Sequence, residues 1–122
     1  SQTRDFTYVE ETAKAIVSIA DNPACYGKCI NFCSGKATSV REIAECICRC
    51  FDLDPNLYIR SEDPRPGDVM HHLGDNTRFR ELLGFVPEMS IEDGIPRTIT
   101  WFESLPLIPR DLLEQEVLKN WE

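Results

Sequence analysis

The residues best suited to chemistry lie in a short loop, residues 62–68, in which Pro64 and Pro66 flank Arg65. Proline fixes its own φ angle and restricts the residue before it to extended conformations, so this loop holds the guanidinium with little freedom to lose. Asp68 follows three residues later. A guanidinium can hold a phosphate through forked hydrogen bonds, while a carboxylate accepts hydrogen bonds from a hydroxyl group. The loop therefore predicts a site for a phosphate and a hydroxyl group, with a solvated surface turn as the alternative.

Size and charge limit the class of ligand. The chain has 122 residues, of which 42% are hydrophobic and 28% charged, as expected for one soluble domain covering residues 1–122. Its net charge of −8 argues against a nucleic-acid partner, because binding to a phosphate backbone draws on a broad basic face. No apolar run approaches the roughly 18 residues of a membrane span. We therefore expect a small anionic ligand, and neither a nucleic-acid nor a membrane partner.

Six cysteines suggest two other kinds of site, a disulfide framework or a metal site. They are Cys25, Cys29, Cys33, Cys46, Cys48 and Cys50. No two form a Cys-x-x-Cys pair, and the only histidines are the adjacent His71 and His72, which suits zinc poorly. The chain starts without a methionine or a secretory signal, so we expect an excised piece of a cytoplasmic protein with reduced thiols. The cysteines are then small buried hydrophobic side chains, with zinc or disulfides as the alternatives.

Strand and helix signals alternate in the first half of the chain. Strands are predicted at residues 5–9, 29–33 and 57–60, with a helix after each of the first two. The first helix carries apolar residues at 13, 16, 17 and 20, and the second at 40, 43, 44, 47 and 51, so each predicts a buried stripe. Ser39 and Glu42 form a capping box before the second helix. This order predicts parallel pairing with right-handed crossovers, and it places the arginine loop after the third strand.

The second half is predicted to be mainly helical. Asp75 is placed to cap a short helix with Phe79 facing inward and Gly84 as its left-handed terminator. Another helix is predicted from Ser90, with a break near Pro96 because proline removes an internal hydrogen bond. The tail carries Leu113, Val117 and Trp121 at helical spacing after Pro109, which suits a first helical position and predicts a helical C-terminus.

Five signatures stand in one order along residues 2–102. They are Gln2-x-Arg4-Asp5-Phe6-x-Tyr8-Val9, Asn31-Phe32-Cys33-Ser34-Gly35, Arg65-Pro66-Gly67-Asp68, Leu83-Gly84-Phe85-x-Pro87, and Ser90-Ile91-Glu92-Asp93-Gly94-Ile95 with Trp101. Through them the chain resembles the C-terminal, substrate-binding part of the extended short-chain dehydrogenase/reductases, the NAD-dependent nucleotide-sugar epimerases and 4,6-dehydratases. The resemblance implies a small α/β substrate-binding domain with short parallel strands alternating with helices.

The resemblance also implies roles for three residues. In this family, the arginines at the positions of Arg4 and Arg65 hold the diphosphate of a nucleotide sugar, and the aspartate at the position of Asp68 meets the nucleotide ribose. The chain departs from the family where Glu11 replaces the commoner aspartate and where Phe32 and the next residue replace a small pair. If Phe32 faced the ligand, the preference for sugar or base would differ from that of close relatives.

The chain lacks the motifs that carry the family's chemistry. Its glycines never have the spacing of a dinucleotide fingerprint, and no Tyr-x-x-x-Lys pair is present. We therefore expect this fragment to be inactive, with no catalytic residue, bound cofactor or metal of its own. The resemblance places NAD in the parent protein, a homodimer whose N-terminal Rossmann half is absent here. The alternative is a stand-alone, non-catalytic module that binds nucleotide sugars or serves interactions.

Overall fold

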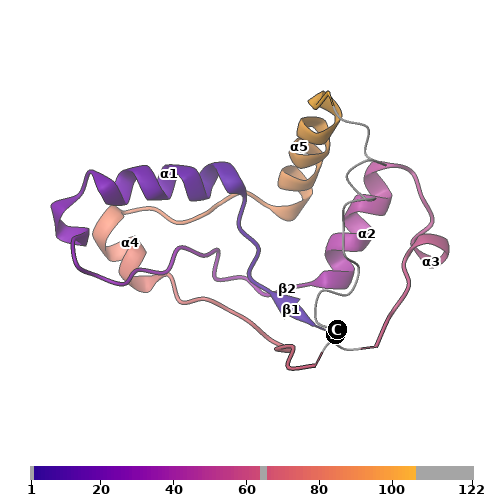
Figure 1. The fold of residues 1–122 in the computed structure, drawn as a ribbon, viewed down its shortest axis with the longest axis horizontal. Helices are drawn as coiled ribbons and strands as arrows, with labels where there is room; N and C mark the ends of the chain where they lie inside the picture. The colour runs from indigo at the N-terminus through magenta and orange to yellow at the C-terminus, as the bar shows by residue number, and fades with distance from the viewer. Residues whose placement is uncertain (1, 64–65, 107–122) are drawn as a thin grey trace.

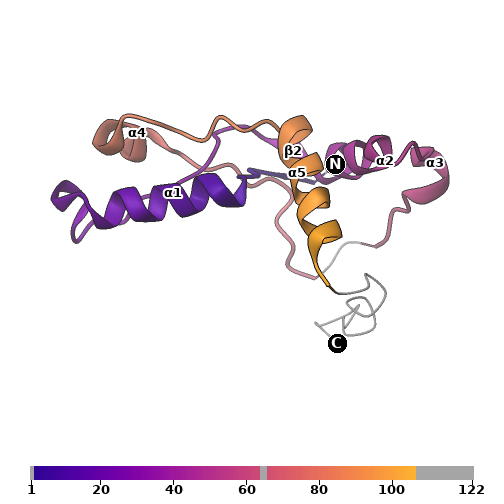
Figure 2. The same ribbon diagram turned by 90° about the horizontal axis from the view of Figure 1, so that it is seen from above.

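The computed structural model describes residues 2–63 and 66–106 (Figure 1). The elements are β1 (Thr3–Arg4), α1 (Val9–Ala20), the 3-10 helix η1 (Pro23–Cys25), β2 (Thr38–Ser39), α2 (Val40–Cys50), α3 (Pro55–Tyr58), α4 (Thr77–Leu83) and α5 (Ile91–Ser104). Two groups of helices lie on either side of the short strands: α1 with α4, and α2 with α3 and α5 (Figures 1 and 2). The molecule is therefore α/β, as predicted, but most of its regular structure is helical.

β1 is the central strand of a small ladder. Thr3 and Arg4 pair antiparallel with Ser39 and Thr38 of β2. On the other side of β1, the Thr3 amide donates to the Met70 carbonyl at 2.9 Å. Thr3 thereby forms a single parallel β-bridge with His71. The predicted parallel pairing is therefore wrong for the two named strands. The ladder nevertheless fixes the segment after the arginine loop beside β1.

None of the three predicted strands forms. Residues 5–8 lead into α1 without a ladder partner, because the Asp5 side chain accepts the backbone hydrogen bonds of another loop. Residues 29–33 are irregular, and their aromatic residue packs into a cluster rather than a sheet. Residues 55–58 form α3, because the Asp54 side chain accepts from the Asn56 amide at 3.0 Å and Pro55 occupies the first turn. Local capping outweighed β-propensity there.

Capping predictions fared better. Ser39 Oγ accepts from the Glu42 amide at 3.1 Å, while the Glu42 carboxylate accepts from the Ser39 amide at 2.7 Å, so the capping box is confirmed. Asn76 occupies the cap position of α4, although Asp75 still accepts from the Thr77 amide at 2.9 Å. The left-handed end of α4 at residue 84 is also confirmed, with φ of +77°.

The predicted break at Pro96 is wrong, because α5 runs from Ile91 to Ser104 with Pro96 inside it. The proline falls in the second turn and lies on the exposed side of the helix. Only the Glu92 carbonyl loses its helical partner, and Glu92 is itself exposed to water, which can take that place. The predicted tail helix from residue 109 lies outside the described residues.

The core is small and is centred on three aromatic rings. Phe79 is fully buried, with ring centroids 4.7 Å from Phe32 and 5.0 Å from Phe85. The predicted buried stripe of α1 is wrong: the helix packs through Ala15 and its neighbours, and its apolar side is open, with Ile16 63% exposed. In α2 as well, residues 40, 47 and 51 are exposed, whereas residues 46 and 48 are buried. Both helices therefore present apolar side chains that nothing in the described part of the chain covers.

Candidate functional site

Two of the three predicted site residues lie against each other. Arg4 Nη2 is 2.8 Å from Asp68 Oδ1, although 64 positions separate them in the sequence. The side chains are 26% and 29% exposed, so the pair is half-buried at the rim of the ladder. The pairing of β1 with residues 70–72 brings Asp68 beside Arg4. The Arg4 Nη1 group donates to the Thr3 carbonyl at 2.8 Å, which fixes the plane of the guanidinium.

The second oxygen of the Asp68 carboxylate is held by Gln2. Its Nε2 group donates to Asp68 Oδ2 at 2.5 Å, and the Gln2 carbonyl accepts from the Val40 amide at 3.0 Å. Sequence reasoning placed Gln2 in a signature without giving it a role. Its position two residues before Arg4, on the same side of an extended strand, was the available signal. Gln2 and Arg4 together orient the carboxylate.

The third predicted residue, Arg65, lies outside the described residues, as does Pro64. The loop resumes in a turn at Pro66 and Gly67, where Gly67 has φ of +76°. That left-handed conformation is one that glycine adopts without strain, as the sequence predicted for a tight turn. The turn leads directly into Asp68.

The arrangement leaves binding capacity on the guanidinium. An arginine carries five N–H donors, and the two described contacts of Arg4 use one on each terminal nitrogen. The remaining donors can meet a further anion, and the neighbouring Asp68 carboxylate can accept from a hydroxyl group. The site therefore offers forked donors and an acceptor side by side, which matches a phosphate next to a sugar diol.

Asp5 is a structural centre that the sequence reasoning missed. Its carboxylate accepts from Ser34 Oγ at 2.6 Å and from the amides of Ser34, Gly35 and Gly74 at 2.8, 2.9 and 3.2 Å. Burial raises the pKa of this carboxyl group, but the four hydrogen bonds outweigh burial and leave the pKa below its usual range. Asp5 thereby ties the end of β1 to two distant loops and fixes the backbone that carries Arg4.

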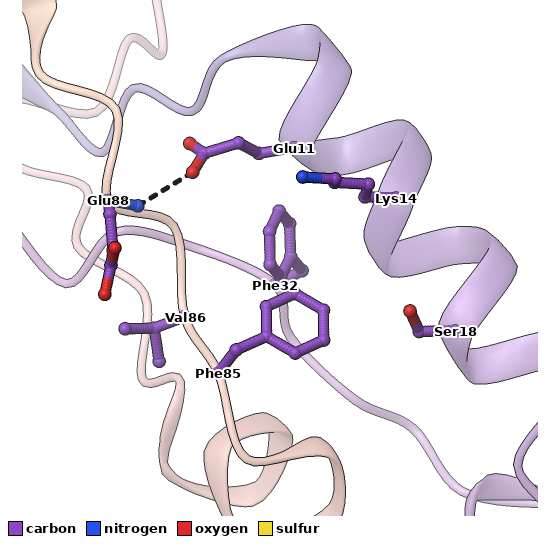
Figure 3. A pocket seen from close by; sticks show the side chains of 7 residues that line it. All are labelled: Glu11, Lys14, Ser18, Phe32, Phe85, Val86 and Glu88. Atoms are coloured by element: carbon purple, nitrogen blue, oxygen red, sulfur yellow. Dashed lines mark hydrogen bonds between the residues drawn. The ribbon is translucent and has the colours of Figure 1, made fainter.

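The two departures from the family serve packing. The Glu11 carboxylate accepts from the amides of Glu88 and Met89 at 2.9 and 3.2 Å, which joins α1 to the segment before α5. Glu11 and Phe32 both line a cavity of about 390 Å³ together with Lys14 and residues 18, 85, 86 and 88 (Figure 3). Neither described cavity that Phe32 lines includes Arg4 or Asp68. This geometry supports a packing role for Phe32 rather than contact with a ligand at the arginine site.

The cysteines are mostly interior. Those at positions 25, 33, 46 and 48 are buried as free thiols, and those at 29 and 50 are exposed. Burial, together with the nearby Asp5 carboxylate, raises the pKa of the Cys33 thiol. Burial also raises the pKa of the Cys46 thiol. Over residues 2–63 and 66–106, no group of three His, Cys, Asp or Glu side chains has the geometry of a metal site. In the same ranges, no helix combines the length and the apolar character needed to cross a membrane.

Comparison with known proteins gives relatives of one kind. No family model matches the chain. The UDP-glucose 4-epimerase of Mycolicibacterium smegmatis is 34% identical over 106 residues, which cover 85% of this chain and 32% of that protein. The chain thus spans about a third of the length of this relative, and from 16% to 33% of the length of other curated relatives.

Solved structures agree with this comparison. The UDP-N-acetylglucosamine 4-epimerase of Methanobrevibacter ruminantium, determined with UDP-N-acetylmuramic acid, superposes with a TM-score of 0.74 at 33% identity. That match covers 84% of this chain and 32% of the epimerase. An NAD-dependent NDP-hexosamine 5,6-dehydratase, TunA, has a TM-score of 0.74 at 27% identity, over 87% of this chain and 34% of the dehydratase. The chain is therefore similar to nucleotide-sugar epimerases and dehydratases, with structural neighbours in the extended short-chain dehydrogenase/reductase fold, and it matches about a third of the length of these relatives.

Proposed function

We propose that the chain binds the nucleotide diphosphate of a nucleotide sugar, as the substrate-binding part of an NAD-dependent sugar epimerase or dehydratase. The observation that carries this proposal is the Arg4–Asp68 pair, which joins two separate family signatures at 2.8 Å. In this proposal Arg4 and Arg65 hold the diphosphate, and Asp68 accepts hydrogen bonds from the ribose. The relatives include proteins whose names specify UDP-linked sugars, which supports a nucleotide diphosphate as the ligand.

Chain geometry supports the inclusion of Arg65. A residue advances the chain by at most about 3.6 Å, so three residues keep the Cα atom of Arg65 within roughly 11 Å of that of Asp68. An arginine side chain covers much of this distance. Asp68 is already in contact with Arg4, so the length of the chain allows the proposed contacts of both arginines with one diphosphate. Two forked donors around one diphosphate are a strong arrangement for charge-assisted hydrogen bonds.

The chemistry itself belongs to the rest of the parent protein. NAD would be held by an N-terminal Rossmann half and would supply reversible hydride transfer at C4 of the sugar. Residues of this chain select and orient the substrate, so the chain alone has neither turnover nor an NAD site. The apolar side of α1 is open, with Ile16 and Val17 each more than 60% exposed. This exposure supports the proposal that the N-terminal half packs against α1 in the parent protein. The parent is then a cytoplasmic enzyme of carbohydrate biosynthesis, and a homodimer.

A binding comparison tests the proposal. The protein used is the parent protein with its N-terminal Rossmann half, either unmodified or with Arg4→Ala. Its affinity is measured for three ligands: UDP-glucose, UDP and uridine. Loss of a forked contact to a diphosphate should weaken UDP-glucose and UDP by roughly ten- to a hundredfold, since an ionised hydrogen bond is worth about 1.5–3 kcal/mol. Uridine lacks phosphate, so it should lose clearly less affinity than UDP, only as much as follows from the loss of the Arg4 contact to Asp68.

Arg41→Ala is the matched control. Arg41 is also an arginine in a surface ion pair, with Glu45 at 2.8 Å, but it lies on α2. It should leave all three affinities unchanged. If Arg4→Ala weakened uridine as much as UDP, the guanidinium would not act on the phosphates and the assignment would be wrong.

A further inference from the structure

A groove of about 770 Å³ lies between the start of α1 and the second half of α5. Its apolar lining includes Tyr8, Val9, Trp101 and Phe102. Val9 is 70% exposed and Trp101 57%, and the ring of Trp101 stands edge-on to that of Phe102 with centroids 4.9 Å apart. α5 also packs on α2, and its residues 91, 95 and 99 are half-exposed, whereas the lining residues Arg97, Trp101 and Phe102 are exposed. Two adjacent exposed aromatic rings in an apolar groove are typical of a surface that another segment covers.

We propose that the C-terminal segment, residues 109–122, folds back along α5 as a helix and fills this groove. The sequence places Leu113, Val117 and Trp121 on one side of such a helix. This segment has 14 residues, the same length as α5, so as a helix it would span about 21 Å, matching α5 from end to end. Four residues, 105–108, separate it from the last residue of α5. Connections of two to five residues are typical of antiparallel helix pairs.

Charge favours the same arrangement. In the proposed antiparallel pair, residue 104 at the end of α5 faces residue 109 at the start of the tail helix. Each step back along α5 then pairs with a step forward along the tail. Arg97 of the groove therefore lies opposite Glu116. Trp101 then lies opposite residue 112, next to Leu113 at the start of the apolar side. Glu10 is the acidic residue of the groove lining and lies at the edge formed by α1. In the proposed arrangement the last part of the tail, which carries the basic residue Lys119, lies toward this edge. Each charged lining residue thus has an opposite charge available on the tail.

Fluorescence of Trp101 tests this proposal in the complete chain. The protein has two tryptophans, Trp101 and Trp121, so Trp121→Phe leaves Trp101 as the only probe and keeps an aromatic ring in the tail. In this background Val117→Asp places a charge on the apolar side of the tail. Because burial of a valine side chain is lost, docking should weaken roughly tenfold or more. Acrylamide quenching of Trp101 should then increase toward that of an exposed tryptophan.

Gln115→Asp is the matched control, because it adds the same charge on the opposite side of the predicted tail helix. It should leave quenching of Trp101 unchanged. A reversal test adds specificity: Arg97→Glu and Glu116→Arg should each raise quenching, and the two together should restore the protection. If Trp101 is fully quenchable in the starting protein, or if Val117→Asp and Gln115→Asp behave alike, the tail does not fill the groove. Protection that disappears on dilution would assign the groove to a second copy of the chain and would also overturn the proposal.

Discussion

Replacement of Asp5 by asparagine should destabilise the fold far more than its half-exposed position suggests. The carboxylate accepts four hydrogen bonds, two on each oxygen, at 2.6 and 2.8 Å on one and 2.9 and 3.2 Å on the other. An amide has a single acceptor oxygen and points its NH₂ group at the remaining donors. Two charge-assisted hydrogen bonds are lost, each worth about 1.5–3 kcal/mol, so the free energy of unfolding should fall by about 3–6 kcal/mol.

Urea unfolding followed by circular dichroism measures this change. Ser34→Ala removes the 2.6 Å hydroxyl contact to Asp5, together with the hydrogen bonds between Ser34 Oγ and the Lys36 backbone. It should cost about 2 kcal/mol, which keeps the test usable if Asp5→Asn does not fold. Asp21→Asn is the control, because Asp21 is exposed at the end of α1 and its side chain makes no hydrogen bond to the described residues. A loss below about 1 kcal/mol for Asp5→Asn would refute the interpretation of Asp5 as a structural tie.

The same residue predicts a pH dependence. The pKa of Asp5 in the folded state lies below its ordinary value. Because the pKa of Asp5 is lower in the folded state than in the unfolded state, the ionised carboxylate stabilises the fold. This stabilisation is fully present above the unfolded-state pKa of about 4, and it is lost as the pH falls through the folded-state pKa. Between about pH 5 and pH 3, the unmodified protein should therefore lose more stability than Asp5→Asn. If the two pH profiles run parallel, the carboxylate is not the charged acceptor described here.

Three further predictions concern the cofactor, the thiols and one glycine. Calorimetric titration of the purified chain with NAD should show no saturable binding, because the dinucleotide fingerprint is missing; micromolar binding would contradict the division of labour proposed here. Alkylation under non-reducing, denaturing conditions should add six labels by mass spectrometry, one for each cysteine; fewer labels would indicate a disulfide, and stoichiometric metal in the purified chain would indicate a metal site. Gly74→Ala should destabilise the chain by about 1–3 kcal/mol in thermal unfolding, because the new Cβ would collide with the buried Cys33 Sγ; an unchanged transition temperature would show that this contact relaxes freely.

The sequence predicted features that depend on neighbouring residues well. The capping box at Ser39 and Glu42 and the glycine end of α4 need only a few adjacent residues, and both are confirmed. The strands failed because strand formation depends on a distant partner. Residues 29–33 have the composition of a strand, but Phe32 packs against Phe79, 47 positions away, and no ladder forms.

The candidate site, too, could be predicted only in part. Motif positions indicated Arg4 and Asp68 as parts of one site, and the structure brings them into contact. The partners that hold them could not be deduced, because Gln2 and Asp5 act through tertiary hydrogen bonds across the ladder. The apolar stripes were misassigned for a related reason. Periodicity identifies an apolar side of a helix, as at Ile16 of α1, but it does not say whether the partner of that side lies within the chain.

The most direct test of the central claim is the affinity of the protein with both halves for UDP-glucose after substitution of Arg65. Arg65→Ala should weaken binding by roughly ten- to a hundredfold, and Arg65→Lys should restore only part of the loss, because an ammonium keeps the charge without the planar fork. Arg60→Ala, which removes an exposed arginine five residues earlier, is the control and should bind as the unmodified protein does. The melting temperature should change little in all three variants. If Arg65→Ala binds UDP-glucose with unchanged affinity while it stays folded, the loop is a solvated turn and the proposed diphosphate site is wrong.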